Sequence, residues 1–355
     1  MLDFCSHDKY YIVSDRVADA CGACNLGRNL RGSPHFFLYR DKGDKMGKIF
    51  LTYEEQLNKL INEKHLIVKD VDYAKEMLMC YSYYSLIGGY KEKFKNPSTA
   101  LYVNAKFEDI VALYEFDEQL REILLKYLLK TEGQVKSHLS YYFCEKYGEQ
   151  QEEYLKPQNY NQEPKNAGDI AKLVKILRRL TEGNTDYHYI NHAIRKHKNV
   201  PLWVLTNALT FGNISKMYML SQYDIQSKVA KNYPGVNEDQ LVKFLSILTH
   251  FRNVCAHGER LYTYRTKKAI PNMPLHEKLK IGKSGQEYVN GKHDLFAAVI
   301  AMRYLLPGKW FLEFKKELIK VINGYLRKST YFTEEQLWGF MGFPNNWKSI
   351  TRFRK

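Results

Sequence analysis

The chain has 355 residues, of which 45% are hydrophobic and 26% charged, a balance that is typical of folded proteins and too apolar for a disordered one. Lys and Arg number 54 against 39 Asp and Glu, which gives a net charge of +15 at pH 7. A field of this sign attracts polyanions, nucleic acid above all, although a merely soluble basic surface would have the same composition.

The sequence predicts neither secretion nor a membrane span. The N-terminus MLDFCSHDKYY lacks the apolar segment of a secretory signal, and the longest apolar run, Leu295 to Met302, is too short to cross a bilayer. Six unevenly spaced cysteines in a chain of this size do not indicate a disulfide framework. We therefore expect a cytoplasmic protein.

Residues 1–48 are rich in Gly, Arg, Asp and Lys and show no sustained period, so we expect a small irregular N-terminal extension. This extension contains a CxxC. Four of its side chains, Cys5, His7, Cys21 and Cys24, would complete the ligand set of a structural zinc site. The spacing matches no strict zinc-finger pattern, so free cysteines in an ordinary packed arm remain the alternative.

Helical periodicity dominates residues 49–355, which we expect to form a second, mainly α-helical domain. Thr52 and Glu55 form a predicted capping box. Apolar residues recur at three- and four-residue steps from Ile110 to Leu128, which predicts one long helix, or two that meet near Gly133. Further helices are expected over Asp72–Tyr84, Asp169–Glu182, Leu202–Leu209, Ser215–Leu220, Asn237–Val254, Asp294–Leu305 and Phe311–Arg327.

Two polar stretches, Pro157–Gly168 and Thr263–Lys292, are expected to be loops. Between Gly258 and Lys292 there are eight Lys and Arg against three Glu, so a mobile basic loop could hold an RNA backbone, or it could be a solvated connector. The 28 tyrosines include some that could stack on unpaired bases. The predicted RNA contacts are Arg260, Tyr262, Arg265, Lys267 and Lys268.

The stretch FRNVCAHGERLY at residues 251–262 carries the residue types that metal-free RNA cleavage needs. The ribose 2′-OH can attack its own phosphate if a histidine moves the proton and an arginine neutralises the developing charge. Asn253 and His257 are four residues apart and share a helical face, flanked by Arg252. The alternative is a helix C-terminal cap, with Gly258 as its first non-helical residue.

Six stretches, in order, resemble the Abi-like proteins of bacterial abortive-infection defence (AbiF/AbiD type), a family of the HEPN superfamily. They are LTYEEQLNKL, YYSLIGGYKEKF, LYEFDEQLREILLKYLLKTEGQVKSHL, PLWVLTNALTFGNISKMY, FRNVCAHGERLY and MGFPNNW, and together they cover residue 50 to the end of the chain. The resemblance implies a HEPN-type helical bundle with a long central helix, and a metal-independent endoribonuclease toxin that needs no cofactor for catalysis.

Carried onto this chain, the resemblance implies that Arg252 and His257 are catalytic and Asn253 supports them. HEPN sites combine two motif copies, and this chain has one, which implies a homodimer. RNA is the implied partner, as substrate and as a restraining small noncoding RNA. The chain departs from the family pattern at Gly258, where a second histidine is frequent, and at Glu259, where toxins silenced by AMPylation have tyrosine. A non-catalytic RNA-binding or scaffold protein, with a structural motif, is the alternative function.

Overall fold

A computed structural model describes residues 49–182 and 185–353. The chain divides into two units, Met1–Phe50 and Leu51–Lys355, and the elements described below all belong to the second. The predicted zinc ligands Cys5, His7, Cys21 and Cys24 lie outside the described residues.

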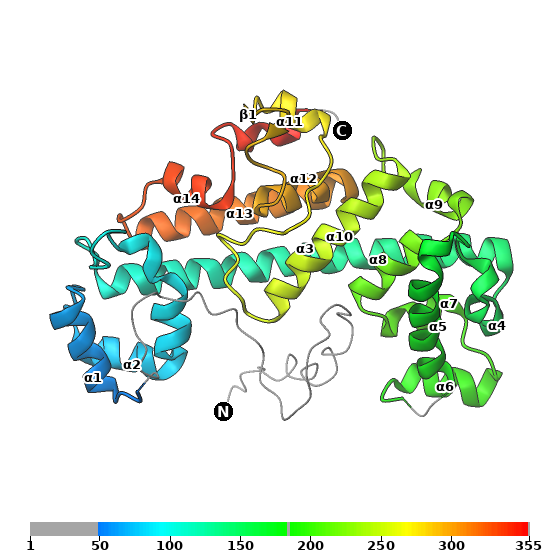
Figure 1. The fold of residues 1–355 in the computed structure, drawn as a ribbon, viewed down its shortest axis with the longest axis horizontal. Helices are drawn as coiled ribbons and strands as arrows, with labels where there is room; N and C mark the ends of the chain where they lie inside the picture. Colours follow the sequence, from blue (N-terminus) through cyan, green and yellow to red (C-terminus); the bar gives the residue numbers. More distant parts are fainter. Residues whose placement is uncertain (1–48, 183–184, 354–355) are drawn as a thin grey trace, which may run out of the picture. The chain divides into compact units, whose positions relative to one another are not determined.

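The described part of the chain is mainly α-helical, as predicted (Figure 1). The only strands in that part form a two-residue antiparallel hairpin, in which Lys283 pairs with Tyr288 and Ser284 with Glu287. In chain order the elements are α1 (Tyr53–Asn58), a π-helical turn (Lys59–Glu63), α2 (Val71–Tyr81), a second π turn (Tyr84–Gly88), a 3-10 turn (Lys91–Phe94), α3 (Phe107–Tyr147), α4 (Gln151–Leu155), 3-10 turns (Pro157–Asn159 and Pro164–Asn166), α5 (Ala167–Glu182), α6 (His188–His197), α7 (Leu202–Leu205), a 3-10 turn (Thr206–Ala208), α8 (Phe211–Leu220), α9 (Tyr223–Ala230), α10 (Glu238–Ala256), α11 (Pro274–Lys278), β1 (Lys283–Ser284), β2 (Glu287–Tyr288), α12 (Leu295–Leu305), α13 (Gly308–Lys328), α14 (Glu334–Met341) and a 3-10 turn (Trp347–Arg352).

The long helix predicted from the apolar repeat is a single element, α3, with 41 residues. Its start is fixed by Asp109, whose carboxylate accepts a hydrogen bond of 3.0 Å from the backbone N–H of Lys106. The helix passes through Gly133 without a break and ends at Gly148, whose φ of +90° favours glycine. The apolar face of α3 packs against α13, α10, α9, α7, α8, α12 and α2, so α3 is the central helix of this unit.

Helix α10, whose last turns contain the start of the stretch FRNVCAHGERLY, begins with a capping box. The Asn237 side chain accepts from the backbone N–H of Gln240, and the Gln240 side chain accepts from the N–H of Asn237, both at 2.9 Å. The apolar residues of α10, among them Phe244, Leu248 and Phe251, are fully buried. They face α3, α8 and α12, and this packing fixes the direction in which the C-terminal end of α10 points.

Several short elements were missing from the sequence-based prediction. The stretch Pro157–Gly168 contains two 3-10 turns, and Thr263–Lys292 contains α11 and the hairpin. The helices α4, α6, α9, α11 and α14 have between 5 and 10 residues. Such lengths hold too few turns for a helical period to emerge from the sequence, because tertiary packing supplies most of the stability of short helices.

Candidate functional site at the C-terminal end of α10

The sequence FRNVCAHGERLY forms the last turns of α10 and the segment that follows. His257 is the C-cap residue, and Gly258 adopts a left-handed backbone with φ of +67°. The N–H of Gly258 donates to the Cys255 carbonyl at 3.3 Å, and the N–H of Glu259 donates to the Val254 carbonyl at 3.0 Å. This pair of bonds is a Schellman motif. The predicted helix cap is therefore present, and it is made by backbone groups.

Because the backbone makes the cap, the side chains of the motif are left for other contacts. His257 is exposed, and Asn253 is half-buried one turn earlier on the same face. The His257 imidazole has no hydrogen bond or ion pair with residues 49–182 or 185–353. A capping role and a chemical role for this histidine are thus compatible.

Arg252 points toward α3, where its guanidinium meets Glu132. The Arg252 Nε lies 3.8 Å from the Glu132 Oε2, and the two side chains are 22% and 7% exposed. Lys136, one turn along α3, contacts the other Glu132 oxygen at 2.7 Å. Within the described residues neither the Arg252 Nε nor the Glu132 Oε2 has a hydrogen-bond partner, although both atoms are buried. The ion pair with Glu132 thus holds the Arg252 side chain, while its Nε–H makes no hydrogen bond with the described residues.

A buried carboxylate on α3, Asp117, holds the segment that follows the motif. Its Oδ2 accepts from the backbone N–H of Leu261 at 2.9 Å and its Oδ1 from the N–H of Tyr262 at 2.7 Å. The Tyr90 hydroxyl donates to the same carboxylate at 2.7 Å, and the Arg121 guanidinium does so at 2.9 Å. Arg121 also donates to the Glu259 carbonyl at 3.4 Å. Residues 259–262 are therefore tied to α3.

The charge state of this cluster follows from its donors. Burial raises the pKa of the Asp117 carboxyl, against the opposing effects of the Arg121 charge and of the hydrogen bonds that the carboxyl accepts. Four donors occupy its acceptor positions, which is the arrangement of an ionised carboxylate. Burial, followed by the charge of Asp117, raises the pKa of Tyr90 far above its usual range, so this hydroxyl remains a donor.

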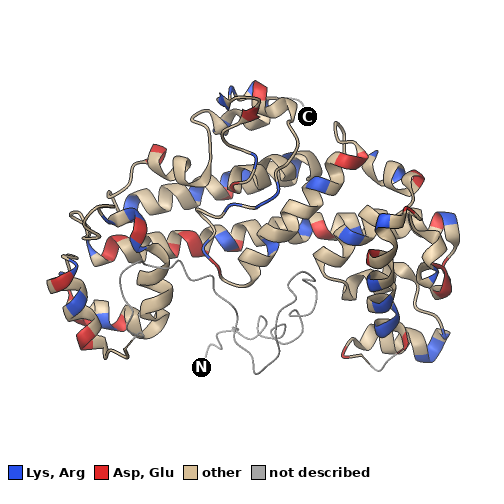
Figure 2. Cartoon of the chain, in the orientation of Figure 1, with Lys and Arg blue, Asp and Glu red and all other residues tan. Residues whose placement is uncertain are grey.

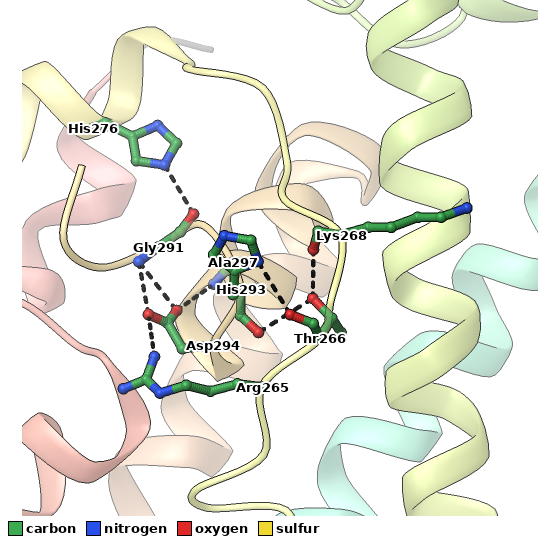
Figure 3. Close-up of polar contacts among 8 residues, drawn as sticks. All are labelled: Arg265, Thr266, Lys268, His276, Gly291, His293, Asp294 and Ala297. Carbon is green, nitrogen blue, oxygen red and sulfur yellow. Dashed lines mark hydrogen bonds and ion pairs between the residues drawn. The ribbon is translucent and has the colours of Figure 1, made fainter. Parts of the chain in front are cut away.

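The basic stretch after the motif is pinned by a second buried carboxylate, Asp294, the N-cap of α12 (Figure 3). Asp294 is 2% exposed and accepts from the N–H groups of Gly291 and Ala297, and its Oδ2 contacts the Arg265 guanidinium at 3.0 Å. Nearby, the imidazole of the buried His276 lies 2.9 Å from the Gly291 carbonyl. The expectation of a mobile loop is corrected here, because both of its ends are bonded into the fold.

The five predicted RNA contacts differ in what their side chains do. Tyr262 is 1% exposed, with its ring packed between Tyr90 and Phe340, so it offers no face on which a base could stack, and we remove it from the predicted contacts. Arg260 is exposed and donates to the Gly89 carbonyl. Arg265, as described, is paired with Asp294. Lys267 and Lys268 are exposed and have no acidic partner in the part of the chain that the structure describes.

His250 is a candidate that sequence reasoning missed. It lies seven residues before His257, hence on the same face of α10, and it is exposed. The part of its ring that packs against neighbouring atoms is desolvated, and this partial burial, followed by the charge of Lys268, lowers the pKa of His250. Figure 3 shows Lys268 extending toward α10. The spacing of His250, Asn253 and His257 was visible in the sequence, but the nearness of Lys268 was not.

Comparison with known proteins decides the family. The family model described as Abi-like protein matches residues 76–263, which is more than half of the chain. The chain belongs to the Abi-like family. The match begins within α2, contains the whole of α3 and α10, and ends one residue after Tyr262, so it includes the motif and its α3 partners Asp117 and Glu132. The basic stretch from Arg265 onward and its anchor Asp294 lie beyond the match. Neither a curated protein nor a solved structure matches the chain.

Membership of the Abi-like family indicates a function of the abortive-infection type. In the described residues of this Abi-like chain, no helix is both long enough and apolar enough to cross a membrane. The same residues contain no group of three or more His, Cys, Asp or Glu side chains placed to hold a metal ion.

The Schellman motif of the Abi-like chain leads to a prediction about Gly258. Replacing it by alanine is expected to lower the free energy of unfolding by about 1 kcal/mol, because a Cβ is strained at φ of +67°. Gly133→Ala is the matched control: this glycine is exposed inside α3 with no atom within 4 Å of an added Cβ, and the change should stabilise the protein by roughly 0.5 kcal/mol. Urea unfolding of both variants measures the difference, and equal stabilities would contradict the role of Gly258.

Proposed function

We propose that this Abi-like protein is a metal-independent endoribonuclease of the HEPN type, acting as a toxin in an anti-phage abortive-infection or toxin-antitoxin system. The observation that carries the proposal is the contrast between two side chains at one helix end. Arg252 is held by the buried Glu132, while His257 is exposed and unpaired within the described residues. A charge-stabilising group and a proton-transfer group are thus offered by one rigid element.

The proposed reaction breaks the P–O5′ bond of RNA. The 2′-oxygen of the ribose attacks the adjacent phosphorus, its proton passes to an imidazole, and the leaving 5′-oxygen receives a proton. The products are a 2′,3′-cyclic phosphate and a 5′-hydroxyl. Arg252 would stabilise the charge of the pentacoordinate phosphorus, and Asn253 would orient the imidazole or bind a phosphate oxygen. DNA lacks the nucleophile and would be spared.

The reaction needs a base on one side of the phosphorus and an acid on the other, and this gives a chemical reason for a homodimer. Each chain offers one motif, and His257 supplies a single imidazole at its helix end. A twofold axis through the site would bring the ends of two α10 helices together, so that one protomer removes the proton and its partner donates one.

The proposed partners are RNA molecules, one as the substrate and one as a small noncoding RNA that restrains the toxin in the cytoplasm. The net charge of +15 supports an anionic partner. Lys267 and Lys268, which follow the motif and are exposed, supply part of that charge next to the proposed site.

Cleavage assays in EDTA test the proposal. Wild-type protein freed of bound nucleic acid is expected to cut single-stranded RNA at an undiminished rate in EDTA, and His257→Ala to cut at least about 100-fold more slowly, because proton transfer by a positioned side chain contributes this much. His65→Asn is the control: this exposed histidine lies outside the site with φ of +60°, which asparagine tolerates.

Three results would count against the proposal. Cleavage that stops in EDTA would exclude the metal-independent mechanism. Cleavage that His257→Ala leaves unchanged would exclude this site. Absence of cleavage by both proteins, with RNA binding retained, would favour the alternative of a non-catalytic RNA-binding or scaffold protein, for which the Asp117 cluster and the Schellman motif would be purely structural.

A further inference from the structure

A cleft of about 930 Å³ lies between α6 and α7, beside Gln150, the N-cap residue of α4, and none of the residues of the site above lines it. Its lining includes four basic or titratable side chains and one indole, which are His188, His192, Arg195, His197 and Trp203. All five are exposed. The cleft is therefore lined by cationic or titratable groups on α6 and by a large aromatic ring on α7.

The walls of the cleft are held by buried neighbours. Ile190 and Ala193 anchor α6, and Leu202 and Leu205 anchor α7. The turn before α6 is fixed by Asn191, whose amide donates to the Thr185 carbonyl at 2.6 Å. The exposed side chains thus extend from a fixed backbone frame, so a ligand would have to order the side chains alone.

Trp203 is unusual among the four tryptophans of the chain. Its exposed fraction is 48%, whereas Trp338 and Trp347 are 7% and 1% exposed and Trp310 is half-buried. An indole ring left open to water beside cationic groups suits a ligand that has both a flat aromatic face and negative charge.

Positive charge is also present on α5, which packs against α6 and α7. Lys172, Lys175 and Arg179 are spaced by three and four residues, so they share one face of α5, and all three are exposed. Lys and Arg follow one another along this helix in Figure 2. The three have no acidic partner among the described residues, and neither does Arg195 in the cleft.

We propose that this cleft binds unpaired nucleotides of an RNA strand, with a base stacked on Trp203, a phosphate at Arg195, and the continuing backbone on the cationic face of α5. A stacking ring joined to a basic track is the arrangement that recognises single strands. The choice of RNA over single-stranded DNA rests on the proposed function, but the binding itself does not depend on cleavage.

Two other ligands fit the cleft less well. A metal ion would require the three imidazoles to converge, and they do not form a metal-holding group. A protein partner would have to bring acidic groups to Arg195 and to the cationic face of α5, whereas a nucleic-acid strand carries a negative charge at every phosphate.

Tryptophan fluorescence tests the inference directly. In the full-length His257→Ala protein, which does not cut under the proposed mechanism, unlabelled oligouridine is expected to quench the emission of Trp203. Trp203→Phe should bind a fluorescein-labelled oligouridine within about threefold of the parent affinity and lose the quenching. Trp203→Ala should weaken binding at least fivefold, since stacking on one aromatic side chain contributes on this scale.

Matched controls distinguish RNA binding at this cleft from nonspecific attraction of RNA to positive charge. Arg195→Gln should weaken binding and lower its salt dependence, whereas Lys320→Gln on α13 should change neither by more than about twofold; both residues are exposed. Tyr223→Ala, which removes an aromatic side chain 69% exposed on α9, should leave the affinity unchanged.

The inference is overturned if Trp203→Ala and the parent bind oligouridine equally, or if duplex RNA binds as tightly as the single strand with no change in tryptophan emission. The outcome is separable from that of the proposed function. Binding that depends on Trp203 in a protein without ribonuclease activity would support the cleft and reject the nuclease. Cleavage by a protein whose RNA binding is insensitive to Trp203 would support the nuclease and reject the cleft.

Discussion

Arg252→Ala is expected to abolish the growth inhibition that the proposed function predicts for the protein when it is produced in bacteria without a restraining RNA. Among the three proposed catalytic side chains, Arg252, Asn253 and His257, the guanidinium is the only group with a permanent positive charge. Loss of one such stabilising group slows cleavage by about 100-fold or more. The fold should survive. Glu132 keeps its contact with Lys136 at 2.7 Å, and the ion pair that is lost has no hydrogen bond, so the free energy of unfolding should fall by about 1 kcal/mol.

Growth curves, cleavage rates and urea unfolding measure these effects together. Arg327→Ala is the control, since Arg327 is an exposed arginine in the last turn of α13, and it should remain as toxic as the wild type. Persistent toxicity of Arg252→Ala, with the protein present at wild-type levels, would remove Arg252 from the mechanism.

Asp117→Ala is expected to cause the largest loss of stability, about 3–5 kcal/mol. The change leaves the Arg121 charge, which is 6% exposed, without its partner, and it leaves the N–H groups of Leu261 and Tyr262 without an acceptor. The segment after His257 would then lose its attachment to α3. Urea unfolding gives the stability, and cleavage measured well below the unfolding midpoint gives the effect on the site.

Two further variants distinguish the loss of the Asp117–Arg121 ion pair from a general failure of the protein to fold. Glu122→Ala, on the exposed face of α3, should change the stability by less than about 0.5 kcal/mol. The double variant Asp117→Ala/Arg121→Met should be more stable than Asp117→Ala alone, because it removes the uncompensated buried charge. A double variant that is less stable than the single one would show that the ion pair is not the source of the loss.

Signals that lie within one element were readable from the sequence. The capping box at Thr52 is present at the start of α1, and the apolar repeat from Ile110 to Leu128 lies within one helix. The glycine after His257 was read as the end of a helix, and its left-handed backbone agrees. These features depend on neighbours three or four residues away, which is why a single sequence reveals them.

The partners of the site could not be read in this way. Asp117 and the N–H of Leu261 are 144 residues apart, and the contact of Glu132 with Arg252 likewise joins two helices that are distant in the chain. One clue was available: Asp117 falls within the apolar repeat, and an acid on a core-facing stripe requires a buried partner. The cleft on α6 and α7 could not be foreseen, because α6 was not predicted.

The length of α3 has a mechanical consequence. At 1.5 Å per residue, its 41 residues make a rod of about 60 Å. This rod carries Asp117, which anchors the segment after the motif, and Glu132, which faces Arg252, and it also packs against α7 beside the cleft. A small rotation or slide of α3 would act on all three places in a single movement. Because α3 is one continuous helix, no hinge or linker interrupts it between the residues that contact the motif and those that pack against α7.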